Sequence, residues 1–273
     1  MLFKRTLTLV ILVLASSSLS YGQSSPEKVA YRPPKLDKPL PFKIGETLTY
    51  EVNFSKLIFS GTIGELKLSV SKSTDSANPE MIELNAEAVS KGFFPALFGV
   101  KVKDRYTSLV DQTDFGVHAS TKLLDQGKLR REQKAVIDRQ AGRVTYSDRD
   151  LTKAKTEAKI KEKASPSWVQ DLLSSIYYVR TQPLNAGDIV PVPISDGGDV
   201  YNIEVIAGRR EEIKTGGGKF KAIQLNVKVF DGRYIRRSGE MLVWVTDDPQ
   251  RIPLRARIKT SGTTITVDLK RMP

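Results

Sequence analysis

Two adjacent carboxylates, Asp247 and Asp248, are the residues of this sequence best suited to chemistry, because paired carboxylates can hold a cation or exchange protons. They lie in the stretch LVWVTDDPQRIPLRARIKTSGTTITVDL, where Arg251, Arg255 and Arg257 follow closely and can neutralise them. A calcium loop needs several spaced oxygen ligands, which the stretch lacks. Aspartate side chains and the following proline are typical turn formers. The pattern therefore predicts a corner between two strands.

Other catalytic groups are scarce. The chain has no cysteine and one histidine, His118, which lies on an alternating stretch without a nucleophile motif nearby. Thiol nucleophiles and multi-histidine metal sites are therefore excluded. The glycine-rich run GGGKFK at 216–221 lacks phosphate-loop spacing and precedes a strand, which favours a hairpin loop. We expect no catalytic residue, no metal site and no cofactor.

The first residues resemble an export signal. Lys4 and Arg5 precede the apolar run 7–15, and the small residues Ser20 and Gly22 suit a signal peptidase. The apolar run is shorter than the roughly 20 residues that cross a bilayer, which argues against an uncleaved anchor. No cysteine follows it, so a lipid-modified cysteine is not expected. We predict a signal peptide over 1–22, cleaved near Gly22.

The charge favours anionic partners. The formal net charge is +12, and it becomes +10 once Lys4 and Arg5 leave with the signal peptide. Such a protein is attracted to anionic surfaces. The basic residues are scattered among acids, as on the solvated faces of strands. For an exported protein we expect an anionic envelope surface as partner and no nucleic acid.

Alternating apolar and polar residues dominate the rest of the chain. Residues 23–41 are rich in proline, serine and lysine and predict an extended lead-in, followed by a single domain over 42–273. Many short alternating segments separated by turn signals indicate an antiparallel sheet. The lysine-rich run 152–163 fits a solvated strand or a linker. Strands are expected around 48–54, 66–70, 82–88, 106–110, 117–123, 133–137, 143–146, 189–194, 201–206, 220–229, 240–245, 254–259 and 263–269.

Two apolar segments break this alternation. In 165–187, Ser165 can cap a helix, Pro166 suits its first turn, and apolar residues recur every three or four positions. In 91–102, four large apolar residues crowd together around Pro95, which argues against a regular strand. This second segment is either packed core or a flap over a cavity. The candidate ligand contacts of the two segments are Phe93, Phe94, Leu97, Phe98, Trp168, Leu172 and Ile176.

Four stretches carry a family resemblance: FKIGETLTYEV, WVQDLLSSIYYVRTQPLNAGD, GKFKAIQLNV and the carboxylate stretch quoted first. Together they resemble DUF3108, a bacterial family of unknown function. Its members share a GE-L-Y opening, a D-L-S-x-Y-Y-x-R helix, a G-x-F-K strand and a W-x-x-D-D-x-R-x-P corner. The resemblance spans 42–269 and is vague over 113–163. It implies kinship with LolA/LolB-like carriers of envelope lipoproteins, which have a curved, unclosed antiparallel barrel with helices over its apolar concave face.

These observations predict a mainly β fold: a large curved antiparallel sheet, or unclosed barrel, with one amphipathic helix packed on its concave face. The expected function is a non-enzymatic periplasmic protein of the cell envelope that binds an apolar or lipid-like molecule in that face. The alternative is an interaction or structural module with a filled core and no ligand. A third hypothesis is a hydrolase that uses carboxylates.

The export signal gives a direct test. Because the cleavage site is predicted near Gly22, the intact mass of the protein recovered from its own envelope should correspond to a chain that starts at or near Gln23. Recovery of the full-length mass from a membrane fraction would contradict the prediction.

Overall fold

The computed structural model describes residues 39–57, 59–74, 80–92, 99, 101–153, 156–232, 234–236 and 238–272. The predicted signal peptide, most of the lead-in and the candidate ligand contacts Phe93, Phe94, Leu97 and Phe98 lie outside these residues. No helix in the described part of the chain is both long and apolar enough to span a membrane.

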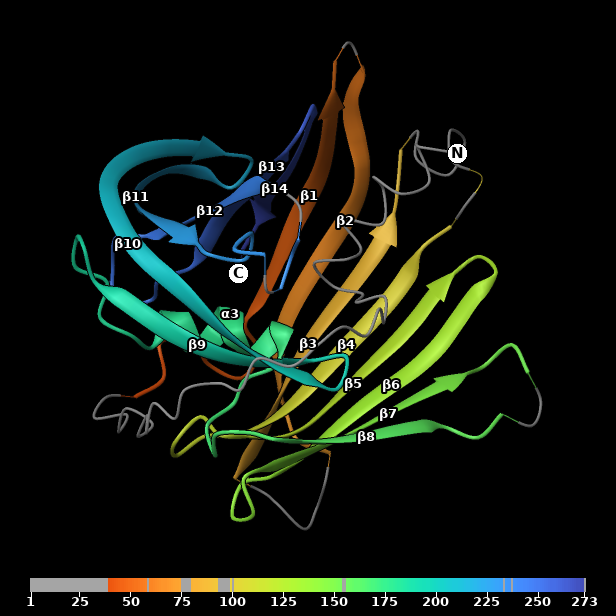
Figure 1. The fold of residues 1–273 in the computed structure, drawn as a ribbon. Helices are drawn as coiled ribbons and strands as arrows, with labels where there is room; N and C mark the ends of the chain where they lie inside the picture. The colour runs from red at the N-terminus through yellow and green to blue at the C-terminus, as the bar shows by residue number, and fades with distance from the viewer. Residues whose placement is uncertain are drawn as a thin grey trace.

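A single antiparallel sheet of 14 strands makes up most of the described chain (Figure 1). Every predicted strand is present, and the lysine-rich run contributes one more, β8. The strands are β1 Thr47–Lys56, β2 Phe59–Lys72, β3 Met81–Ser90, β4 Lys103–Asp111, β5 Val117–Gln126, β6 Leu129–Asp138, β7 Arg143–Asp150, β8 Lys159–Ala164, β9 Ile189–Asp196, β10 Asp199–Thr215, β11 Gly218–Val227, β12 Gly239–Thr246, β13 Pro253–Thr260 and β14 Thr263–Arg271.

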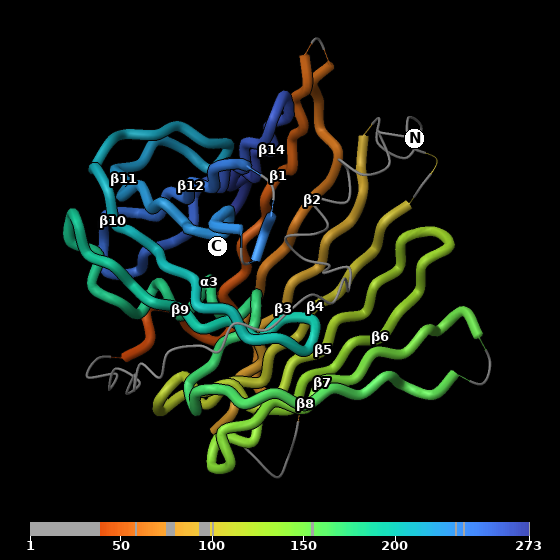
Figure 2. Tube along the Cα trace, in the orientation of Figure 1, coloured from red at the N-terminus to blue at the C-terminus, as the bar shows by residue number. Residues whose placement is uncertain are grey.

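The strand order makes the first and last strands neighbours. It runs β8-β7-β6-β5-β4-β3-β2-β1-β14-β13-β12-β11-β10-β9, so two meanders are joined where β1 pairs with β14. Figure 2 shows the two meanders as the two sides of a curved wall. The outer strands β8 and β9 do not pair with each other, so the barrel is unclosed, as predicted.

Within the described residues, one helix, α3 (Leu172–Arg180), lies inside the curve of the sheet. It starts later than predicted, because Ser165 is not its cap. Backbone bonds of Gln170 to Pro193 and Ser195 tie the preceding segment to β9 instead. Asp171 is the N-cap: its carboxylate accepts hydrogen bonds from the backbone of the first turn, and Ser174 bonds back to the Asp171 N–H. This reciprocal pattern is a capping box.

The helix fills the concave side that it faces. Leu172 and Tyr177 are buried, as is Trp168 just before the helix, and Ile176 packs against the same core at its margin. α3 contacts β9 on one side of the sheet and β3 and β4 on the other. The expected packing of one amphipathic helix on the concave face is therefore confirmed.

A filled core beneath α3 predicts that added volume is not tolerated. Leu172→Trp should lower the free energy of unfolding by about 1–3 kcal/mol, because an extra ring must displace packed neighbours. Chemical denaturation measures the loss. Ile189→Trp, on an exposed side chain of β9, serves as the control and should change stability little. Equal stability of the two variants would mean that space remains under the helix.

Candidate binding cleft

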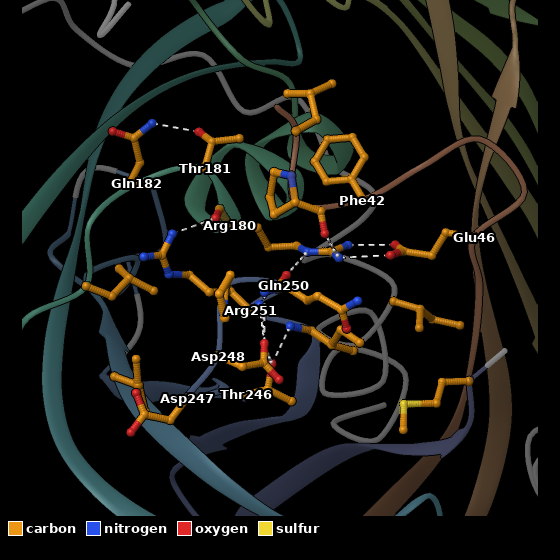
Figure 3. Close-up of a pocket in the computed structure, with 18 of the residues that line it drawn as sticks. Phe42, Glu46, Arg180, Thr181, Gln182, Thr246, Asp247, Asp248, Gln250 and Arg251 are labelled. Atoms are coloured by element: carbon orange, nitrogen blue, oxygen red, sulfur yellow. Dashed lines mark hydrogen bonds and ion pairs between the residues drawn. The ribbon is translucent and has the colours of Figure 1, made fainter. Parts of the chain in front are cut away.

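A cleft of about 1230 Å³ opens beyond the C-terminal end of α3. Most of its lining comes from three places far apart in the sequence: the segment leading into β1, the residues that end and follow α3, and the turn between β12 and β13 (Figure 3). Residues of β10 and β11 and the residue after β14 add to it. The same three places supply motifs of the family resemblance. The charged residues of the lining are Lys43, Glu46, Arg180, Arg210, Asp247, Asp248 and Arg251.

A buried ion pair joins the first two walls. Arg180 Nη1 lies 2.6 Å from Glu46 Oε1, and Arg180 Nη2 lies 2.9 Å from Glu46 Oε2. The Arg180 side chain is 1% exposed and that of Glu46 10%. Two parallel charge-assisted hydrogen bonds in a dry setting fix the geometry of both side chains.

Arg180 also reaches the third wall. Its Nε donates to the Gln250 carbonyl over 3.0 Å, and its Nη2 donates to the Pro41 carbonyl over 3.2 Å. The guanidinium lies 5.1 Å from the ring centre of Phe42 and 5.3 Å from that of Tyr177, within cation–π range. One side chain therefore ties the lead-in segment, the helix and the turn together.

The turn between β12 and β13 confirms the predicted corner. Asp248 Oδ1 accepts hydrogen bonds from Thr246 Oγ1 (2.8 Å), Gln250 N (2.8 Å) and Arg251 N (3.1 Å). Asp247 instead pairs with Arg210 of β10 over 3.1 Å. The two carboxylates thus face different partners. Within the described residues, no group of three or more acidic or histidine side chains is placed to hold a metal.

Arg251 occupies a constrained position in this corner. Its φ is +45°, a left-handed conformation that is uncommon for a residue other than glycine. Its Nη1 donates to the Arg180 carbonyl over 3.0 Å, as Figure 3 shows. Partial burial lowers the pKa of its guanidinium, and the nearby Asp248 charge opposes this shift.

The rest of the lining is mainly apolar. Leu48, Leu184 and Ile223 are almost fully buried and form the base of the cleft, and Ile252 is nearly as buried. Three further apolar side chains of the lining are partly exposed: Leu40, Phe220 and Met272. The cleft therefore combines an apolar base with a charged wall.

The candidate ligand contacts of the sequence lie elsewhere. Trp168, Leu172 and Ile176 belong to the core under α3 and do not line this cleft. Their part in binding stays a prediction, as does that of the phenylalanine-rich segment outside the described residues. Glu46 and Arg180 had no chemical role in the sequence interpretation. The sequence offered one signal for them: Glu46 and Arg180 each lie in a stretch that carries the family resemblance.

The concave face is not uniformly apolar, which corrects the expectation of an apolar face. Tyr106, Lys122, Gln133 and Asp148 occupy one register row across β4 to β7, and all four are buried. Lys122 forms an ion pair with Asp196 at the end of β9, across the open side of the sheet.

Further polar groups extend this interior cluster. Tyr234 donates to Asp196 Oδ2 over 3.0 Å, and Arg131 pairs with Asp148 over 2.6 Å. Burial raises the pKa of the Asp104 carboxyl to about 6, although Gln126 and a backbone N–H donate to it. Among these contacts, the Lys122–Asp196 pair joins β5 to the end of β9 across the open side of the sheet, so we interpret this pair as a clasp.

The sheet, the helix and the cleft define a class: an open antiparallel half-barrel with one helix on its concave face. A β-barrel-like protein of the DUF1849 domain from Brucella abortus has a similar fold, with a TM-score of 0.58 and 10% identity over 84% of this chain and 96% of that one. A Bacteroides fragilis protein described as exported, with a YmcC-like fold, aligns at a TM-score of 0.34 with 9% identity over 86% and 98% of the two chains. A Parabacteroides distasonis protein described as a lipoprotein aligns at 0.30 with 7% identity over 87% and 100%.

The chain belongs to the DUF3108 family of proteins of unknown function, whose family model matches residues 49–270. The family expected from the sequence is therefore confirmed. The matched region starts just after Glu46 and includes Arg180 and the corner. No curated protein matches the sequence.

The buried ion pair predicts a large loss of stability when one partner is removed. Glu46→Ala leaves the Arg180 charge buried without its carboxylate, which should cost about 3–5 kcal/mol in the free energy of unfolding. Denaturant titration measures it. Glu240→Ala, at an exposed glutamate of β12, is the matched control and should stay within about 0.5 kcal/mol of wild type. A loss below 1 kcal/mol for Glu46→Ala would contradict the structural role of the pair.

Proposed function

We propose that this protein is a non-enzymatic binding protein of the cell envelope, and that its cleft holds a lipid-like ligand. The observation that carries the proposal is the cleft of about 1230 Å³, with its apolar base and charged wall. Ligand pockets are typically about 300–1,000 Å³, mostly apolar, with a few placed polar groups. A cleft at or above this range suits an elongated, flexible molecule such as an acyl chain.

Apolar surface at the cleft supports an apolar ligand. Leu40, Phe220 and Met272 are only partly buried, so a ligand that covers them removes apolar surface from water. Each Å² so covered contributes roughly 25 cal/mol. Leu48 and Ile223 beneath them offer further apolar contact.

The carboxylates of the cleft favour binding over catalysis. Glu46 is held by Arg180 through both oxygens, and Asp247 is paired with Arg210. Asp248 Oδ1 is engaged in the corner. A general acid or base must reach a substrate proton. Side chains held in this way are better suited to shaping a cleft.

The predicted signal peptide supports a periplasmic location. The formal net charge of +10 after its removal supports attraction to anionic envelope surfaces.

The alternative is an interaction or structural module without a ligand. The burial of Trp168, Leu172 and Tyr177 favours it, because α3 fills the part of the concave face that was expected to hold the ligand. Under this alternative the cleft is a docking place for a protein.

Binding can be tested with a fluorescent fatty-acid probe and with lipid extraction of protein purified from its own envelope. Met272→Trp adds bulk at the cleft and should weaken probe binding at least about tenfold. Ile189→Trp adds similar bulk to β9 outside the cleft and should bind as wild type does. Thermal unfolding of both variants controls for folding. If wild type binds no probe and yields no lipid, the module without a ligand becomes the preferred function.

A further inference from the structure

We propose that Arg251 makes the cleft selective for amphipathic anions. Arg251 binds a carboxylate or phosphate head group, and the apolar residues at the base of the cleft contact the ligand's acyl chain. This inference rests on the proposed function, since it names the ligand class of the same cleft. Four observations carry it: the charge balance of the lining, the contacts of Arg251, the backbone that holds it, and its place beside the apolar base.

The charges of the lining leave a cationic excess. Four cations and three carboxylates line the cleft. Arg180 and Arg210 are each paired with one of these carboxylates. The remaining groups are Lys43, Arg251 and Asp248. The Oδ1 atom of Asp248 faces the corner, where it accepts its three hydrogen bonds. With the Asp248 charge counted, the three remaining groups carry one net positive charge.

The guanidinium of Arg251 has more N–H donors than the hydrogen bond found for it uses. A guanidinium carries five N–H donors, and the contact found for this one within the described residues is Nη1 to the Arg180 carbonyl. Among the ion pairs of the described chain, none includes Arg251. By contrast, Arg255, four residues later, pairs with Asp268. Burial lowers the pKa of Arg251 and the nearby Asp248 charge only partly offsets this shift, so an anionic ligand would further stabilise the charged guanidinium.

The backbone holds Arg251 in place for this role. Its left-handed φ of +45° is maintained by hydrogen bonds from its own N–H to the side chain and to the carbonyl of Asp248. A residue that keeps such a conformation is fixed by its surroundings, and such positions are common at ligand sites. Because the bond to the Arg180 carbonyl fixes one end of the guanidinium, less side-chain freedom is lost when an anion binds.

Ile252, the residue after Arg251, places an apolar side chain beside the proposed head-group site. Ile252 lies in the base of the cleft, and its N–H bonds to Thr246 Oγ1 over 2.9 Å. Consecutive residues thus contribute a cation and an apolar wall. Arginine suits carboxylate and phosphate groups because its planar fork can bind two oxygens at once. The geometry therefore matches a molecule with an anionic end and an apolar body.

The experiment compares a fluorescent fatty acid with its methyl ester, which has the same chain and no charge. Wild type should bind the acid at least about tenfold more tightly than the ester. Arg251→Gln should abolish this preference, so that acid and ester bind with similar affinity. Arg255→Gln, outside the cleft lining, should keep the preference. Competition by lysophosphatidic acid and by unlabelled fatty acid shows whether phosphate or carboxylate is the better head group.

The outcomes separate the two proposals. If neither acid nor ester binds wild type, the proposed function fails and this inference fails with it. If wild type binds both equally, or Arg251→Gln keeps the full preference, selectivity by Arg251 is overturned and the binding cleft stands. If Arg251→Gln does not fold, Arg251→Met, which also removes the charge, replaces it. Loss of the preference in Arg251→Met supports the proposal, and an unchanged preference overturns it.

Discussion

The bidentate pair between Glu46 and Arg180 is the contact on which the arrangement of the cleft depends. Withdrawing both charges from water is expensive, and the attraction between them offsets this only when further polar contacts are made. Here the carbonyls of Gln250 and Pro41 and the ring face of Phe42 supply such contacts. The result is a fixed junction between the lead-in segment, the end of α3 and the corner. The cleft is the space that this junction leaves at the margin of the core.

Local sequence pattern was enough to predict the sheet. Half-buried strands alternate with a period of two, so residues such as Leu48 and Tyr50 identified β1 without reference to any partner. The helix was found from its apolar spacing, but its start was misplaced. Ser165 is a good cap in isolation, yet Gln170 pairs with β9, and that non-local contact decided where the helix could begin.

The site was harder to predict because it is assembled at the ends of elements. Glu46, Arg180 and Arg251 carry no shared local pattern, and only the folded sheet brings them together. The polar row on the concave face was missed for a related reason. Alternation assigns a lysine or glutamine to the solvent side, whereas Lys122 is directed inward and is balanced by Asp196 from a strand much later in the chain.

The pairing of β1 with β14 has a consequence for how the chain acquires its structure. Because β1 comes first and β14 last in the sequence, the centre of the sheet cannot form until the end of the chain is available. Contacts between such distant segments slow folding, because loop closure must precede their formation. In the meantime β1 and β13 each present an unpaired edge, which is a template for aggregation. Loss of the last nine residues of the sheet, Thr263–Arg271, would make that exposed state permanent.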